Sequence, residues 1–196
     1  MTPAVILFDL GGVLLPVDQR RRLRAVAGAL GISEAEARVA LDAHLFAQLD
    51  IGQVDEQAFA DSFAAAAGRA VTRAEARALI LSVFEAPDDE TWAIAQHLRE
   101  QAIVGGFSDN PPFVREVFPA GADLDPMFWS AELGATKATE AAFAMVEARL
   151  GAEPDAILFV DDSEANVAIA RRRGWQAHRF SGSSALRADL AERGLI

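Results

Sequence analysis

The sequence predicts an α/β protein, a doubly wound parallel sheet with an all-helical segment inserted after its first strand. In the second half of the chain, short apolar runs alternate with segments of helical period. A similar apolar run, residues 5–8, stands near the start of the chain. Between the two lies a long Ala-rich stretch that is helical in period and short of strand signals. We therefore expect a Rossmann-like core formed by residues 1–15 and 88–196, with a helical cap formed by residues 16–87.

The first strand, V-I-L-F over residues 5–8, runs directly into Asp9, which two glycines soon follow. An apolar run with β-branched and aromatic members is typical of a buried strand, and the glycines allow a sharp bend where it ends. Asp9 should therefore lie at the carboxyl end of a central strand, which is where ligands bind in open α/β sheets. The alternative is that Asp9 only caps a turn.

Helical period and stop signals predict four helices in the insert, over residues 18–30, 33–50, 55–67 and 72–86. Two of them open with capping boxes, Ser33 with Glu36 and Thr72 with Glu75. The remainder alternates strands and helices. Its strands are predicted at residues 102–107, 127–130, 156–160 and 176–180, and its helices at 88–101, 111–118, 138–150, 164–173 and 184–193, with a loop at 132–137.

Composition narrows the classes of function. The chain has 196 residues, a formal net charge of -11 and a pI of about 4.7, which argues against non-specific binding to nucleic acid or to an anionic membrane. It has no Cys, and its three His are widely spaced, which argues against disulfides, thiolate catalysis and a zinc site. No signal peptide or membrane-spanning run is evident. We expect a cytoplasmic monomer or homodimer.

Polar residues at the ends of parallel strands converge on one edge of a sheet. Here these residues are Asp9, Ser108, the pair Asp161 and Asp162, and Lys137 on a nearby loop. Three converging carboxylates repel each other unless a cation lies between them, and oxygen ligands without His or Cys favour Mg²⁺. The lysine charge and the serine hydroxyl suit a phosphoryl group. We therefore expect Mg²⁺ and a small phosphorylated metabolite to bind there.

Four segments resemble the motifs of the haloacid dehalogenase superfamily of hydrolases, in the family's order. They are F-D-L-G-G-V at residues 8–13, F-S-D-N at 107–110, G-A-T-K at 134–137 and F-V-D-D-S at 159–163, with Ala138 where the family usually has Pro. The helical insert between the first two motifs is similar to the cap of the phosphatase-like branch. The D-L-G form of the first motif resembles a subgroup that includes glucose-1-phosphate-type phosphatases.

The resemblance implies roles for these residues. Asp9 would be the nucleophile that forms an aspartyl-phosphate, while Ser108 and Lys137 would hold the phosphoryl oxygens with Asp109 beside them at the substrate. Mg²⁺ would be held by Asp9, Asp161 and Asp162 and by the backbone carbonyl of Gly11. The implied reaction is Mg²⁺-dependent hydrolysis of a small phosphate monoester, with the cap setting specificity.

One departure from the family pattern concerns proton transfer. Gly11 stands where the family usually has a second Asp, the general acid and base, and such help is typically worth about 10²–10⁴-fold in rate. The substrate could carry a good leaving group, or another residue could serve, with Asp18, Asp109 and His44 as candidates. The third possibility is a weak enzyme that mainly binds a phosphorylated ligand.

The second enzyme hypothesis is a 2-haloacid dehalogenase, whose members also lack the second Asp and displace halide without metal. They typically carry an aromatic residue there and need no metal-binding acid pair. Gly11 together with Asp161 and Asp162 therefore argues against it.

Overall fold

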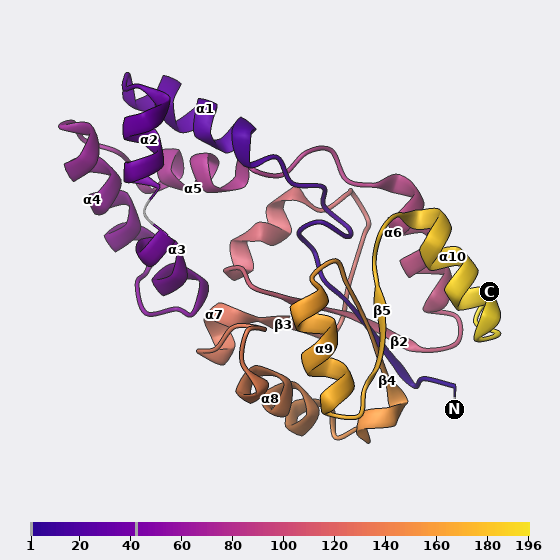
Figure 1. The fold of residues 1–196 in the computed structure, drawn as a ribbon. Helices are drawn as coiled ribbons and strands as arrows, with labels where there is room; N and C mark the ends of the chain where they lie inside the picture. Colours follow the sequence, from indigo (N-terminus) through magenta and orange to yellow (C-terminus); the bar gives the residue numbers. More distant parts are fainter. Residues whose placement is uncertain (1, 42) are drawn as a thin grey trace.

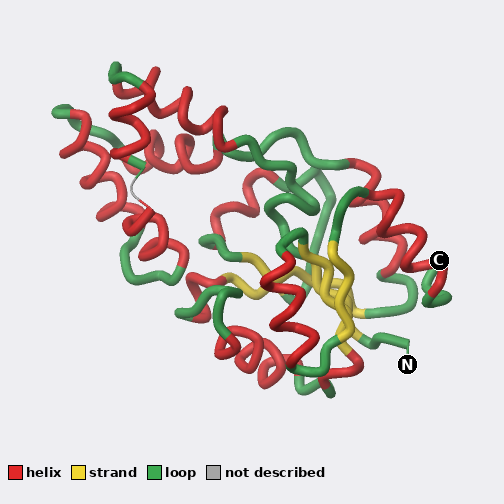
Figure 2. Tube along the Cα trace, in the orientation of Figure 1, coloured by secondary structure: helices red, strands yellow, loops and turns green. Residues whose placement is uncertain are grey.

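The computed structural model describes residues 2–41 and 43–196 of the chain. Its core is a sheet of five parallel strands in the order β3-β2-β1-β4-β5, visible at the centre of Figure 2. The strands are β1 (Val5–Phe8), β2 (Ile103–Ser108), β3 (Met127–Trp129), β4 (Ile157–Asp161) and β5 (Gln176–Arg179). The predicted fold class is confirmed, and the strand that ends at Asp9 is the middle strand of the sheet.

Helices cover both faces of the sheet, because alternate residues of the buried strands point to opposite sides. Ile6 and Phe8 pack with α6 (Asp89–Leu98) and α10 (Ser183–Glu192). Val5 and Leu7 belong to the other cluster, with α8 (Glu140–Leu150) and α9 (Glu164–Arg172). The interiors of β1, β2, β3 and β4 therefore read as continuous apolar runs with polar residues where β2 and β4 end, whereas the edge strand β5 is mostly polar.

The insert forms a separate helical unit to one side of the sheet (Figure 1). In the described part of the chain it comprises α1 (Gln19–Leu30), α2 (Glu34–Ala40), α3 (Ala43–Asp50), α4 (Glu56–Ala67) and α5 (Arg73–Leu81). It has a hydrophobic core of its own, in which Phe59 contacts Phe46 and Phe63 edge to face. Both predicted capping boxes are present.

The prediction of one helix over residues 33–50 was wrong. The chain forms α2 and α3 instead, because Leu41 has a ψ of 47°, which takes the backbone out of the helical region. Two smaller corrections concern the core. Residues 112–117 form a 3₁₀-helix, η1 (Pro112–Val117), and a short helix, α7 (Ser130–Leu133), enters the segment expected to be a loop.

Two groups of contacts hold the insert against the core. At the linkers, Val17 and Phe84 form an antiparallel bridge, and the Asp18 amide donates to the Val83 carbonyl over 2.8 Å. At the far end of α3, the Ser130 hydroxyl donates to the main-chain carbonyl of Asp50. The end of α3 is thereby fixed beside the carboxyl edge of the sheet.

Two ion pairs of Arg77 add to these contacts, one within the insert and one between the insert and the core. Arg77 on α5 pairs with Glu56 within the insert and with Glu116 on η1 of the core. The turn η2 (Pro154–Ala156) precedes β4. Among the residues that the structure describes, we find no helix of the length and apolarity needed to cross a bilayer.

Candidate active site

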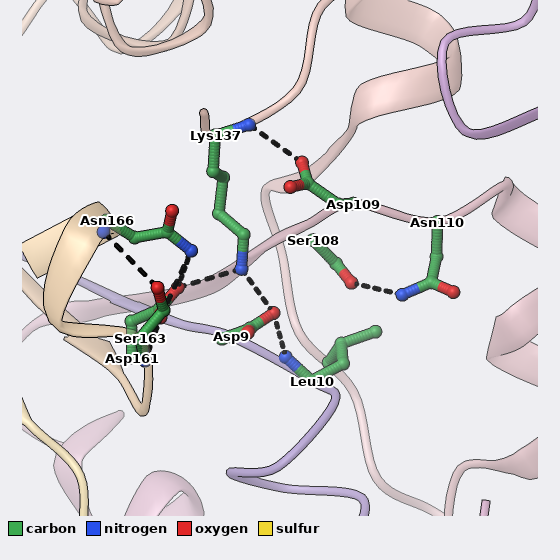
Figure 3. Close-up of polar contacts among 9 residues, drawn as sticks. All are labelled: Asp9, Leu10, Ser108, Asp109, Asn110, Lys137, Asp161, Ser163 and Asn166. Atoms are coloured by element: carbon green, nitrogen blue, oxygen red, sulfur yellow. Dashed lines mark hydrogen bonds and ion pairs between the residues drawn. The ribbon is translucent and has the colours of Figure 1, made fainter. Parts of the chain in front are cut away.

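A buried lysine joins two carboxylates at the carboxyl edge of the sheet (Figure 3). Lys137 Nζ lies 2.6 Å from Asp9 Oδ1 and 2.8 Å from Asp161 Oδ2. All three residues are buried, with 2% of Lys137 and 7% of Asp9 exposed. Three segments far apart in the sequence therefore place their charged groups in direct contact, as the strand-end argument predicted.

Backbone and amide donors hold these carboxylates in place. The Leu10 amide donates to Asp9 Oδ1 over 2.7 Å, where the chain turns after β1. Asp161 accepts from the Ser163 amide over 2.8 Å and from Asn166 Nδ2 at the start of α9. Each carboxylate is thus oriented by the first residues of the loop or helix that follows its strand.

Burial and neighbouring charge set the protonation of the group. Burial raises the pKa of Asp9, the positive charge of Lys137 lowers it and the nearby Asp161 raises it, and together they bring the pKa to about 7. Burial alone would lower the pKa of Lys137, but the Asp9 and Asp161 carboxylates outweigh it, and the pKa rises above its usual value. Lys137 therefore stays charged and favours the ionised form of Asp9.

The residues present fit a divalent cation. Asp9, Asp161 and Asp162 each offer a carboxylate oxygen, and these oxygens lie within 4.8 Å of one another. Hard oxygen donors of this kind suit Mg²⁺. Gly12 is needed beside them, because its φ is +81° and an added Cβ would lie 2.5 Å from Asp162 Oδ2. Any other residue at Gly12 would push the exposed Asp162 carboxylate aside.

The predicted phosphate-binding residues lie around β2. Ser108 ends that strand fully buried, and its hydroxyl accepts from Asn110 Nδ2 over 3.0 Å. Asp109 accepts from the Lys137 amide over 2.9 Å, and burial raises its pKa. Asp109 therefore ties the Lys137 loop to β2, while in Figure 3 no hydrogen bond joins the Ser108 hydroxyl to Lys137, Asp9 or Asp161.

A cavity of about 350 Å³ opens between this group and the insert. The core lines it with Asp9, Gly11, Asp109, Asn110, Lys137 and Asn166. The linkers and the insert line it with Val17, Gln19, Arg22, Phe46, Asp50, Ile80, Val83 and Phe84. The cavity thus has one polar wall from the sheet edge and a mixed wall from the helical unit.

Sequence reasoning missed Asp50 and singled out no individual Arg for the site. The guanidinium of Arg22 lies 4.5 Å above the Phe46 ring and donates to Gln19 over 2.6 Å. Asp50 is the last residue of α3. The sequence held one signal for Asp50. A carboxylate at a helix C-terminus interacts unfavourably with the helix dipole, which suggests a functional role for the residue.

Two of the three candidate proton donors can be placed. Asp18 lies at the start of α1, where it accepts from the Arg20 amide over 2.8 Å and pairs with Arg24 on the surface. Asp109 lines the cavity but is engaged by the Lys137 amide. The side chain of His44 lies outside the part of the chain that the structure describes.

Comparison with known families identifies the family of the chain. A family model described as haloacid dehalogenase-like hydrolase matches residues 3–174. The chain belongs to the haloacid dehalogenase-like hydrolases. The match confirms the resemblance inferred from the four motifs, while the assignment to a D-L-G subgroup stays a prediction.

Relatives within this hydrolase family cover nearly the whole chain. The D-ribitol-5-phosphate phosphatase of Bacteroides thetaiotaomicron is 26% identical, over 94% of this chain and 95% of its own length. The structure of a HAD family enzyme from the same organism, in complex with magnesium and inorganic phosphate, covers 91% of this chain and 94% of its own, with 20% identity and a TM-score of 0.81. A predicted HAD-like hydrolase from Porphyromonas gingivalis gives a TM-score of 0.83 at 25% identity, over 97% and 98% of the two chains.

Proposed function

We propose that this hydrolase is a Mg²⁺-dependent phosphatase that cleaves a small phosphate monoester. The observation that carries the proposal is the buried contact of Lys137 with Asp9 and Asp161, two members of a three-carboxylate cluster at the edge of the cavity. A phosphoryl group there would meet a nucleophile and a fixed positive charge. The D-ribitol-5-phosphate phosphatase among the relatives supports a phosphorylated polyol or sugar as substrate.

In the proposed reaction, an Asp9 carboxylate oxygen attacks phosphorus in line as the bond to the ester oxygen breaks. Lys137 and Ser108 hold the phosphoryl oxygens, and water then hydrolyses the aspartyl-phosphate to release phosphate. Mg²⁺, held by Asp9, Asp161, Asp162 and the Gly11 carbonyl, would supply positive charge that offsets the carboxylates and the phosphoryl group. Lys137 also favours the ionised form of Asp9, which is the form that can act as a nucleophile.

The helical insert contributes the second wall of the cavity. We propose that residues 16–87 act as a cap over a core of residues 1–15 and 88–196. A cavity of about 350 Å³ matches a small metabolite. Closure of the cap would exclude water during phosphoryl transfer, and residues of the insert would set specificity.

Phosphate release tests this proposal. The purified protein should release phosphate from polyol or sugar phosphates with Mg²⁺ and lose this activity with EDTA or in Asp9→Asn. Chloride release from a 2-haloacid without metal would instead support the dehalogenase hypothesis. Binding of phosphorylated ligands with no turnover on any ester would support the binding-protein hypothesis.

A further inference from the structure

We propose that Asp50, from the helical insert, is the general acid and base that exchanges a proton with the leaving group and the attacking water. This inference rests on the proposed phosphatase function and assigns the task that Gly11 cannot perform. Asp50 and Gly11 line the same cavity as Asp9. The acid would thus come from the cap instead of from the loop after β1.

The fold fixes Asp50 at the cavity from two sides. Its main-chain carbonyl accepts from the Ser130 hydroxyl on α7 of the core. Two residues later, Gly52 has a φ of +69° and approaches Ala131 so closely that an added Cβ would lie under 3.0 Å from the Ala131 carbonyl oxygen. The core therefore positions the end of α3 directly, and a flexible linker is not the only connection between Asp50 and the sheet edge.

The position of Asp50 suits the geometry of phosphoryl transfer. Attack and departure are roughly in line, so the ester oxygen leaves on the side of phosphorus opposite Asp9. Asp9 is on the core wall of the cavity, and the insert supplies the other wall. A proton donor on the insert therefore faces the departing oxygen.

The Asp50 carboxyl is also uncommitted. Within residues 2–41 and 43–196 it makes no hydrogen bond or ion pair, whereas Asp109 holds the Lys137 amide and Asp18 caps α1. The charged groups that act on it are Asp109 of the core and Arg22 of α1. Burial, followed by Asp109, raises the pKa of Asp50 to about 7, and Arg22 opposes them. Near neutral pH both its acid and its base forms are available, as alternating proton transfer requires.

The proton balance is simple. As Asp9 bonds to phosphorus and the ester P–O bond breaks, the protonated Asp50 gives its proton to the departing oxygen, and an alcohol leaves. The Asp50 carboxylate then takes a proton from the water that attacks the aspartyl-phosphate. Phosphate and ionised Asp9 are released, and Asp50 is again protonated.

Leaving-group dependence tests the proposal. Asp50→Asn should lower kcat for a polyol phosphate by about 10²–10⁴-fold, the usual worth of general acid–base help. The first step on an aryl phosphate such as p-nitrophenyl phosphate needs no proton donor, so its rate in single turnover should fall by less than about tenfold.

For the wild type, kcat on the polyol ester should decline above about pH 7 as Asp50 ionises, and this decline should be absent in the variant. Asp61→Asn, at an exposed carboxylate on α4, is the matched control.

A rescue variant separates loss of the acid from loss of structure. Gly11 has room for a side chain, because among the described residues an added Cβ would meet only Val17 Cγ1, at 3.6 Å. Gly11→Asp placed in the Asp50→Asn background should restore turnover of the polyol ester by at least about tenfold. No rescue, with equal losses on both esters, would overturn the inference, as would a rise in KM without a fall in kcat. A wild type that releases phosphate from no ester would instead overturn the proposed function itself.

Discussion

At the scale of single residues, the site depends on one cation among carboxylates. Lys137 is the charged partner of both Asp9 and Asp161. All three side chains are buried, so solvent screens the two ion pairs only weakly. Removing one member of a buried ion pair leaves an uncompensated charge, which costs far more than the pair itself contributes. Stability and catalysis are therefore linked at Lys137.

Lys137→Met should lower the free energy of unfolding at pH 8, without metal, by about 3–5 kcal/mol. The same variant should gain more stability from added Mg²⁺ than the wild type, because the metal then supplies the only positive charge between Asp9 and Asp161. Denaturant unfolding with EDTA and with Mg²⁺ measures both effects. An equal response to Mg²⁺ in the two proteins would contradict this account of Lys137.

The raised pKa of Asp50 predicts that the free energy of unfolding depends on pH. Its pKa is raised to about 7 in the folded protein, so ionisation destabilises the fold progressively between about pH 4 and 7. One pKa unit is worth about 1.4 kcal/mol, so Asp50→Asn should raise the free energy of unfolding at pH 8 by roughly 2–4 kcal/mol. At pH 4 the difference should shrink to under about 1 kcal/mol, since Asp50 is then protonated in the folded state and about half protonated in the unfolded state. Unfolding curves at the two pH values check this, and a pH-independent difference would contradict it.

At the scale of elements, the end of α3 shows where sequence patterns stop being informative. The strand ends were predictable because an apolar run followed by a carboxylate is a local pattern, and a parallel sheet brings such ends to one edge. The docking of α3 on α7 depends on Ser130 and Ala131, which lie some eighty residues further along the chain. No local pattern predicts that contact, so the sequence did not place Asp50 at the sheet edge, and the unfavourable position of its carboxylate at a helix C-terminus was the one local signal.

Two glycines in the insert give a matched pair of variants for this contact. Gly52 and Gly68 both have left-handed backbone, with φ of +69° and +61°. An alanine at either position should therefore lower the free energy of unfolding by about 1–2 kcal/mol. At Gly52 the new Cβ would also strike the core, at the Ala131 carbonyl, whereas at Gly68 no atom of the described part of the chain lies within 4 Å. Gly52→Ala should therefore lower kcat/KM by at least about tenfold, as expected for a misplaced Asp50, and Gly68→Ala should not.

Steady-state kinetics on a polyol phosphate, at a temperature where both variants are folded, compares the two. Equal activities would show that the contact between the α3 end and α7 does not position the site.

At the scale of the whole molecule, the order of motifs predicted the architecture well. The central β1, the parallel sheet and an inserted helical unit follow from strand and helix periods alone, and the family match confirms the resemblance. The break between α2 and α3 was not predictable, since the capping box marks where a helix starts and no Gly or Pro marks the end of α2. The arrangement of core and insert around one cavity is a tertiary property.

Metal binding should stabilise the assembled molecule. At about a hundred times its Kd, Mg²⁺ should add about 2.7 kcal/mol to the free energy of unfolding, because the carboxylate cluster exists only in the folded state. Asp162→Asn should reduce that gain with little effect on the metal-free protein, since Asp162 is exposed. Asp155→Asn, at an exposed carboxylate before β4, is the control and should respond to Mg²⁺ as the wild type does.

The most direct measurement is to look for the covalent intermediate on Asp9. The protein would be mixed with Mg²⁺ and a phosphorylated polyol or aryl phosphate, quenched in acid during turnover, digested and analysed by mass spectrometry. We expect a phosphoryl group on the peptide that contains Asp9, and none in Asp9→Asn. Phosphate release with no phosphorylated Asp9 peptide at any quench time, or release that persists in Asp9→Asn, would contradict an aspartyl-phosphate mechanism.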